Sequence, residues 1–104
     1  MGNYIRRFGG LLAVAAIVAS FGSQAATVRV DEAFRLASDG VIKPFEDLNQ
    51  TALQKRPGRI QDSRLDNNRG HYVYQLEILD AKGAQWAVNV DAVTGQFIDE
   101  KRKE

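Results

Sequence analysis

The residues of this chain that could do chemistry are few and scattered. The chain has a single histidine, His71, which directly follows the turn-like segment 67–70, and it has no cysteine. One histidine without a thiolate partner cannot build the usual nitrogen–sulfur zinc site, and zero cysteine excludes thiol catalysis and disulfides. We therefore expect His71 to be a solvated residue beside a turn, and neither a general base nor a metal ligand.

The acidic residues suggest no catalytic pair. Glycosidase-like catalysis needs two carboxylates held across a cleft, and a small domain whose acids lie near turns has little room for one. We expect surface positions for the acids considered, which are Asp62, Asp66, Glu77 and Asp80. In the segment 91–95, Asp91 could resemble a calcium ligand. We expect instead that its carboxylate accepts turn amides while Gly95 supplies a positive φ.

Other catalytic motifs are also missing from the sequence. No glycine-rich phosphate loop joins a strand to a helix, and Ser38 and Ser63 do not lie in a nucleophile elbow. The sequence therefore predicts a protein that is not an enzyme, with no cofactor and no bound metal.

The first 25 residues have the three parts of a secretory signal peptide. Arg6 and Arg7 precede an apolar run over 11–21, and Ser23 and Ala25 place small residues at the cleavage positions. The alternative is a retained membrane anchor, but a span needs about 20 apolar residues. We expect cleavage after Ala25, which would leave 26–104 periplasmic or secreted, with no stable membrane insertion.

Charge and length restrict the possible partners. The chain carries 14 Lys and Arg and 13 Asp and Glu, a formal net charge of +1, and loss of Arg6 and Arg7 with the leader makes it −1. Nucleic-acid binding requires clustered cations, so we exclude that class of partner. The remaining residues suffice for one domain with its core at about 31–99, held by apolar packing without disulfides.

Two helices are predicted from apolar residues at helical spacing. The first would end near Gly40, and its apolar stripe is Ala33, Phe34, Leu36 and Ala37. The second would begin with Pro44 in its first position and end at Pro57 and Gly58. Its apolar stripe is Phe45, Leu48, Ala52 and Leu53.

After Gly58 the apolar pattern changes to a period of two, which is typical of strands. The segment 59–66 is a weak strand, because Ile60 and Leu65 would lie on opposite faces unless a bulge intervenes, and we expect it at an edge. Stronger strands are predicted at 71–79 and 85–91, followed by a short one at 96–99 and a charged tail that frays.

The alternation predicts one apolar sheet face, formed by Tyr72, Tyr74, Leu76, Ile78, Trp86, Val88 and Val90. Tyr72, Tyr74 and Trp86 could instead anchor a binding interface, but core packing fits their pattern better. Short turns make sequential strands antiparallel neighbours. The predicted fold class is therefore α+β, with one or two helices on one face of a three- to four-stranded antiparallel meander.

Segment 71–98 carries a signature that resembles a PepSY domain, and the resemblance covers roughly 31–99. The aromatic-rich strand 71–79, the second strand 85–91 and above all the turn Asp91-Ala-Val-Thr-Gly95 carry this resemblance. The family is known from pro-regions of thermolysin-like metallopeptidases, where it restrains the peptidase, and from small stand-alone exported bacterial proteins. The resemblance implies a module that is not itself an enzyme. Because no peptidase follows in this chain, any inhibition would act in trans.

We therefore expect a non-catalytic binding module that modulates another envelope or secreted protein, such as a peptidase. The alternative is a regulatory partner for the periplasmic sensor domain of a signalling system. Contact would be made by the edge strand 59–66 or by the polar sheet face. The candidate partner-binding residues are Arg59, Gln61, Arg64, His71, Gln75, Glu77 and Asn89. The sequence leaves the sheet order and the oligomeric state open.

Overall fold

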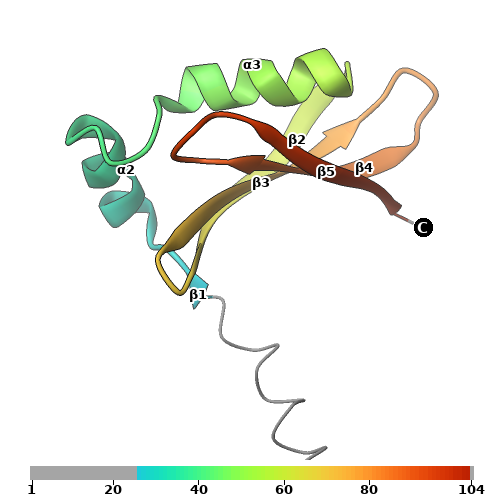
Figure 1. Cartoon of the computed structure of the whole chain (residues 1–104). Helices are drawn as coiled ribbons and strands as arrows, with labels where there is room; N and C mark the ends of the chain where they lie inside the picture. Colours follow the sequence, from blue (N-terminus) through green and yellow to red (C-terminus); the bar gives the residue numbers. More distant parts are fainter. Residues whose placement is uncertain (1–25, 104) are drawn as a thin grey trace, which may run out of the picture.

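The computed structural model of the protein describes residues 26–103, and the expected signal peptide at 1–25 lies outside them. Figure 1 shows two helices and an antiparallel sheet, so the predicted α+β class is confirmed. The elements are β1 (Ala26–Thr27), α2 (Val30–Ser38), α3 (Phe45–Lys55), β2 (Arg59–Asn68), β3 (His71–Leu79), β4 (Gln85–Asp91) and β5 (Phe97–Lys103). The sheet has five strands in the sequential order β1-β2-β3-β4-β5.

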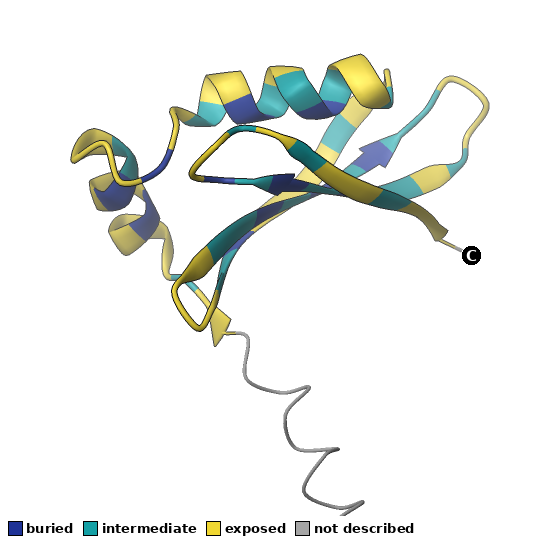
Figure 2. Ribbon diagram, viewed as in Figure 1, coloured by how far each residue is buried: buried dark blue, intermediate teal, exposed yellow. Residues whose placement is uncertain are grey.

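The core lies between the helices and one face of the sheet, as Figure 2 shows by the dark residues beneath α3. Its strand residues are Leu65, Tyr74, Leu76, Ile78, Val88 and Val90. Tyr72 and Trp86 are half-buried and pack against this cluster. The predicted two-residue period and the core role of the aromatic residues are therefore confirmed.

Helix α3 covers the middle of the sheet because one of its sides is apolar. Leu48 and Ala52 are fully buried, while Glu46 and Asp47 in the first turn and Lys55 in the last turn match the helix dipole. The sequence prediction placed Pro44 inside the helix. It lies just before it, in an extended conformation with φ −58° and ψ 143°.

A bulge in β2 explains the irregular spacing of its apolar residues. Ile60 pairs with Ile78 and Asp62 with Glu77, which leaves Gln61 as the extra residue. The bulge allows Ile60 and Leu65 to lie on the same face. The predicted edge position is correct only in part, because β1 pairs with the far end of β2 at 66–67.

Two other expectations from the sequence are corrected by the structure. The charged tail does not fray after residue 99, because β5 continues to Lys103 and pairs with β4 along this length. Phe34 does not belong to the core stripe of α2, since it is 61% exposed while Ala33 and Leu36 are buried.

Candidate functional site

The sheet face opposite the helices carries a row of polar residues that crosses four strands. Arg64 lies opposite Gln75, Gln75 opposite Asn89, and Asn89 opposite Asp99. The Gln75 amide donates to Asn89 Oδ1 at 3.2 Å, and the Asn89 amide donates to Asp99 Oδ1 at 2.7 Å. We call the residues Arg64, Gln75, Asn89 and Asp99 the polar row.

Further polar contacts surround this row. Lys103 Nζ contacts Glu77 Oε2 at 2.6 Å. Gln85 Nε2 lies 3.5 Å from Gln61 Oε1, which places the bulged residue toward the same face. The hollow lined by Asp62, Ser63, Arg64, Gln75 and Glu77 has a volume of only about 30 Å³. A face this flat suits a protein surface better than a small molecule.

The structure does not bring all seven candidate residues together. Five of them gather on the middle of the sheet face opposite the helices, namely Gln61, Arg64, Gln75, Glu77 and Asn89. Arg59 and His71 are both exposed and lie at opposite ends of the β2–β3 ladder, paired with Leu79 and Asn68 respectively.

The outer edge of β2 is covered at only one of its ends. Leu65 O accepts a hydrogen bond from Val28 N at 2.7 Å, and β1 pairs only with 66–67. The chain then enters α2 at Val30 and leaves the strand. Within the part of the chain that the structure describes, no strand pairs with this edge over 59–64. We call this segment the open edge.

Backbone geometry determines which groups the open edge presents. Successive residues of a strand direct their amide and carbonyl groups to opposite sides. Because the Leu65 carbonyl faces β1, the Ser63 amide and carbonyl also face away from β3. The Ser63 N–H is bonded at 2.9 Å to Oδ1 of the neighbouring Asp62, a side chain that is exposed.

An apolar hollow of about 380 Å³ lies beside the open edge. We call it the α2 groove, and it is lined by Thr27, Val28, Val30, Ala33, Phe34, Phe45, Ser63, Arg64, Leu65 and Tyr74. The Phe45 ring contacts the Phe34 and Tyr74 rings, with centroid distances of 5.6 and 5.4 Å. Sequence reasoning missed this groove, because it placed Phe34 in the core.

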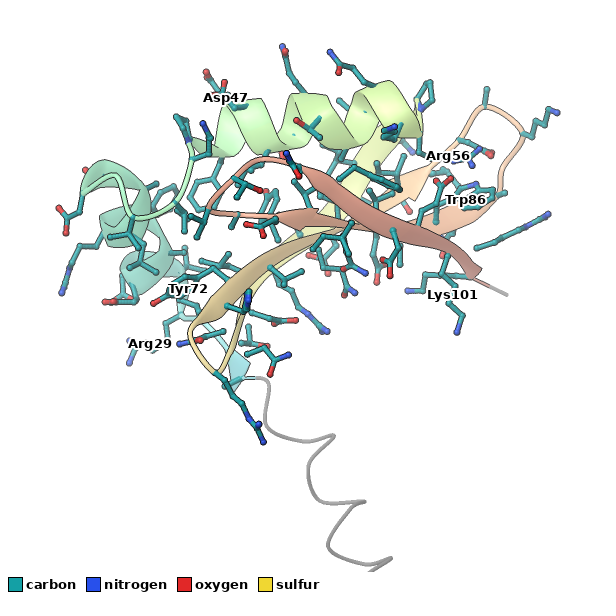
Figure 3. The ribbon with its side chains drawn as sticks, viewed as in Figure 1. Arg29, Asp47, Arg56, Tyr72, Trp86 and Lys101 are labelled. Atoms are coloured by element: carbon teal, nitrogen blue, oxygen red, sulfur yellow. The ribbon has the colours of Figure 1, made fainter. Side chains whose placement is uncertain are left out.

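A clamp at the C-terminal end of α3 fixes the helix to strands β4 and β5. Arg56 donates from Nε and Nη2 to the two carboxylate oxygens of Glu100, each at 2.9 Å, and its guanidinium lies 3.6 Å from the Trp86 ring centroid. Figure 3 shows Arg56 and Trp86 close together at this end of α3. The Trp86 indole in turn donates to Asp80 Oδ2 at 3.0 Å. These contacts direct the charged groups of Arg56 and Glu100 toward each other, so we assign the clamp a structural role.

The charges of the clamp stabilise one another. Hydrogen bonding to Glu100 raises the pKa of Arg56, and the hydrogen bond from Arg56 lowers the pKa of Glu100. The indole hydrogen bond from Trp86 lowers the pKa of Asp80.

The turn after β4 has the geometry that the sequence predicts. Asp91 Oδ1 accepts hydrogen bonds from the amides of Val93 and Thr94, at 2.9 and 3.0 Å, and Gly95 has φ +80°. The Thr94 amide is the main cause that lowers the pKa of Asp91. Within residues 26–103, no group of three or more His, Cys, Asp and Glu side chains is arranged to hold a metal ion.

Comparison with known proteins identifies the family. Residues 43–101, more than half of the chain, match the family described as "Peptidase propeptide and YPEB domain". The chain belongs to the PepSY family. PepSY domains are generally non-catalytic propeptide or regulatory modules that occur in exported proteins, and no catalytic family is indicated.

The match covers α3 through most of β5, so the helix α2 and the strand β1 precede the PepSY segment. A relative is the "Uncharacterized protein YkoJ" of Bacillus subtilis (strain 168), 29% identical over 56 residues. This alignment covers 54% of the chain and only 33% of YkoJ, so the chain spans about a third of that relative's length. No solved structure matches the chain. Among the helices of the described region, none has the length and apolarity that a membrane crossing requires.

Proposed function

We propose that this PepSY protein is an exported, non-catalytic binding module that modulates another envelope or secreted protein, with a peptidase as the expected class of partner. The observation that carries the proposal is the open edge of β2, which has no strand partner over 59–64 within the described chain. Membership of the PepSY family supports the peptidase as partner.

An open edge binds its partner through the backbone. Unpaired amide and carbonyl groups can add an extended segment as a further strand, and such main-chain bonds supply affinity while side chains supply selectivity. A peptidase loop or substrate-like strand held in this way would be restrained next to the module. The candidate residues divide accordingly, with Arg59, Gln61 and Arg64 at the edge.

The polar face would provide the second contact area. Gln75, Glu77 and Asn89 are half-exposed and already oriented by side-chain hydrogen bonds, so little conformational entropy is lost when they meet a partner. His71 lies at the rim of this area and contributes at most a peripheral contact.

The proposal is tested by affinity capture from an envelope extract with residues 26–104 as bait, followed by a peptidase assay with the captured protein. We expect a peptidase whose activity changes when the module is added in stoichiometric excess. Arg64→Glu should weaken capture, whereas Lys82→Glu, the same charge reversal in the exposed turn between β3 and β4, should not. Capture of a sensor protein instead would favour the signalling alternative, and a captured peptidase that does not respond would contradict the proposal.

A further inference from the structure

We infer that the α2 groove is a specificity pocket for one large apolar side chain of an extended peptide segment that pairs with the open edge. The Asp62 side chain opposes this pairing. The inference rests on the proposed function, because it names the chemistry of the segment that the module would bind. It concerns a surface whose wall, α2, lies before the matched PepSY segment 43–101.

The first argument is that edge and groove share residues. Ser63 and Leu65 direct their backbone groups outward from β2, and both side chains line the α2 groove. Directly opposed residues of neighbouring strands place their side chains on the same face of the sheet. A partner residue opposite Ser63 would therefore direct its side chain toward the groove.

The second argument is that the groove is apolar and has room. Val30 is 71% exposed and Phe34 is 61% exposed, although both are large apolar residues on one helix. Ser63 is the only small polar side chain that β2 contributes to the lining, and it is exposed and fills little of the 380 Å³ hollow. Burial of a large apolar side chain there would remove Val30 and Phe34 from water.

The third argument concerns the kind of occupant. The outward backbone groups of this edge lie beside an apolar hollow. An extended polypeptide can pair with them once the Asp62 carboxylate releases the Ser63 amide, whereas a lipid chain or a helix cannot. A second copy does not fit well. Two β2 strands paired antiparallel around Ser63 would bring Gln61 of each copy beside Leu65 of the other, where Val28 already lies. The occupant is therefore a short segment that ends or turns away near Val28.

The Asp62 side chain competes with an added strand for the edge of β2. Its Oδ1 accepts the hydrogen bond of the Ser63 amide at 2.9 Å, which is the donor that an added strand would need. Charged residues at free edges commonly oppose unwanted strand pairing. An incoming carbonyl must displace this carboxylate, so removal of the carboxylate should favour binding.

The probe for the test is a short capped peptide of alternating threonine and leucine with a central phenylalanine and terminal lysines, added to ¹⁵N-labelled residues 26–104. We expect amide shift changes centred on 59–65 and α2. Replacement of the peptide's phenylalanine by serine should weaken binding by about tenfold or more, as expected for the loss of one buried large side chain. N-methylation of alternate peptide bonds should abolish binding.

Matched variants of the protein test the two parts of the inference. Val30→Ser should weaken peptide binding several-fold, whereas Val93→Ser, at an exposed valine outside the groove, should leave it unchanged. Asp62→Ala should tighten binding. Because Val30 and Asp62 are exposed, these variants should keep the thermal stability of the parent, which circular dichroism would check.

The inference is overturned if the peptide does not bind at millimolar concentration, if its shift changes lie on β5 or the polar face, or if Val30→Ser and Val93→Ser behave alike. Concentration-dependent dimerisation that blocks peptide binding, seen by sedimentation, would show a second copy as the occupant and would also overturn it. The capture experiment keeps the proposed function separate. A peptidase that is captured and modulated equally by Val30→Ser refutes the groove and leaves the function standing.

Discussion

Hydrogen bonds within the fold favour the charged form of three carboxylates of this protein. Glu100 accepts from Arg56, Asp80 from the Trp86 indole, and Asp91 from the Thr94 amide, and these bonds lower the pKa of each acid. Carboxyl groups whose pKa is lower in the folded state stabilise the fold above the pKa of the unfolded chain. Their contribution is lost as the pH falls through the folded-state pKa.

The first prediction is a loss of stability in acid. Urea midpoints should be nearly constant from pH 7 to about pH 5 and should fall below about pH 4.5, where unfolded carboxyl groups begin to bind protons. Glu100→Gln should lower the midpoint at pH 7 and flatten the slope between pH 5 and 3. Glu46→Gln, at an exposed glutamate that only matches the dipole of α3, should shift the curve much less. A Glu100→Gln profile parallel to that of the parent would contradict the assigned role of the Arg56–Glu100 pair.

The second prediction concerns the geometry of the arginine clamp. Arg56→Lys keeps the charge but loses the two-pronged bond to Glu100 and the stacking on Trp86, so the Tm should fall by several degrees. Arg64→Lys is the matched control, because Arg64 is more than half exposed and its contact with Asp66 is a single one at 3.3 Å. Equal Tm values for the two variants would show that charge alone matters at Arg56.

At the scale of elements, the sequence was informative wherever a pattern repeats. In strands β3 and β4 an apolar residue recurs at every second position, and in helix α3 apolar residues recur at each turn. The bounds and the inner faces of these three elements could therefore be predicted. Strand β1 has only two residues and no pattern to read. Its pairing with β2 depends on tertiary contacts, which a local pattern does not contain.

The polar sheet face opposite the helices could be predicted from the sequence, but the α2 groove could not. Alternation alone places Gln75, Glu77 and Asn89 outward. The position of Phe34 depends on how the nine-residue helix α2 is rotated against the sheet, and a helix this short has several nearly equivalent apolar stripes. The length of β5 was underestimated because its last residues are charged. The strand continues to Lys103 by pairing with β4, and Glu100 and Lys103 make long-range contacts with Arg56 and Glu77.

The third prediction belongs to the junction between α3 and β2. A Cβ atom on Gly58 would overlap the carbonyl oxygen of Leu79 and crowd the Ile78 side chain, so the backbone would have to move. Gly58→Ala should lower the free energy of unfolding by about 3 kcal/mol. Gly83→Ala, at a turn glycine with φ +83° and open space around it, should cost only about 1 kcal/mol. Chemical denaturation measures both free energies of unfolding. Equal losses would show that the close approach of Gly58 to Leu79 does not determine the cost of the substitution.

At the scale of the whole molecule, the helices and the core occupy one side of the sheet and leave the polar outer face and the open edge of β2 uncovered. α3 lies over the inner face of the sheet and α2 beside its end (Figure 1). The polar row lies on the outer face, and the open edge of β2 borders the α2 groove.

The last prediction concerns the signal peptide that the sequence predicts at 1–25. We expect that the exported protein has an intact mass that corresponds to residues 26–104, and that this form unfolds in one cooperative transition, because the core and the sheet lie within it. Ala25→Leu should block processing, since a signal peptidase requires a small residue at this position, whereas Gln24→Leu should be processed normally. Mass spectrometry of the envelope and soluble fractions distinguishes the forms. A protein that retains residues 1–25 in both variants and in the parent would identify the leader as a retained anchor, and the open edge would then act close to the membrane surface.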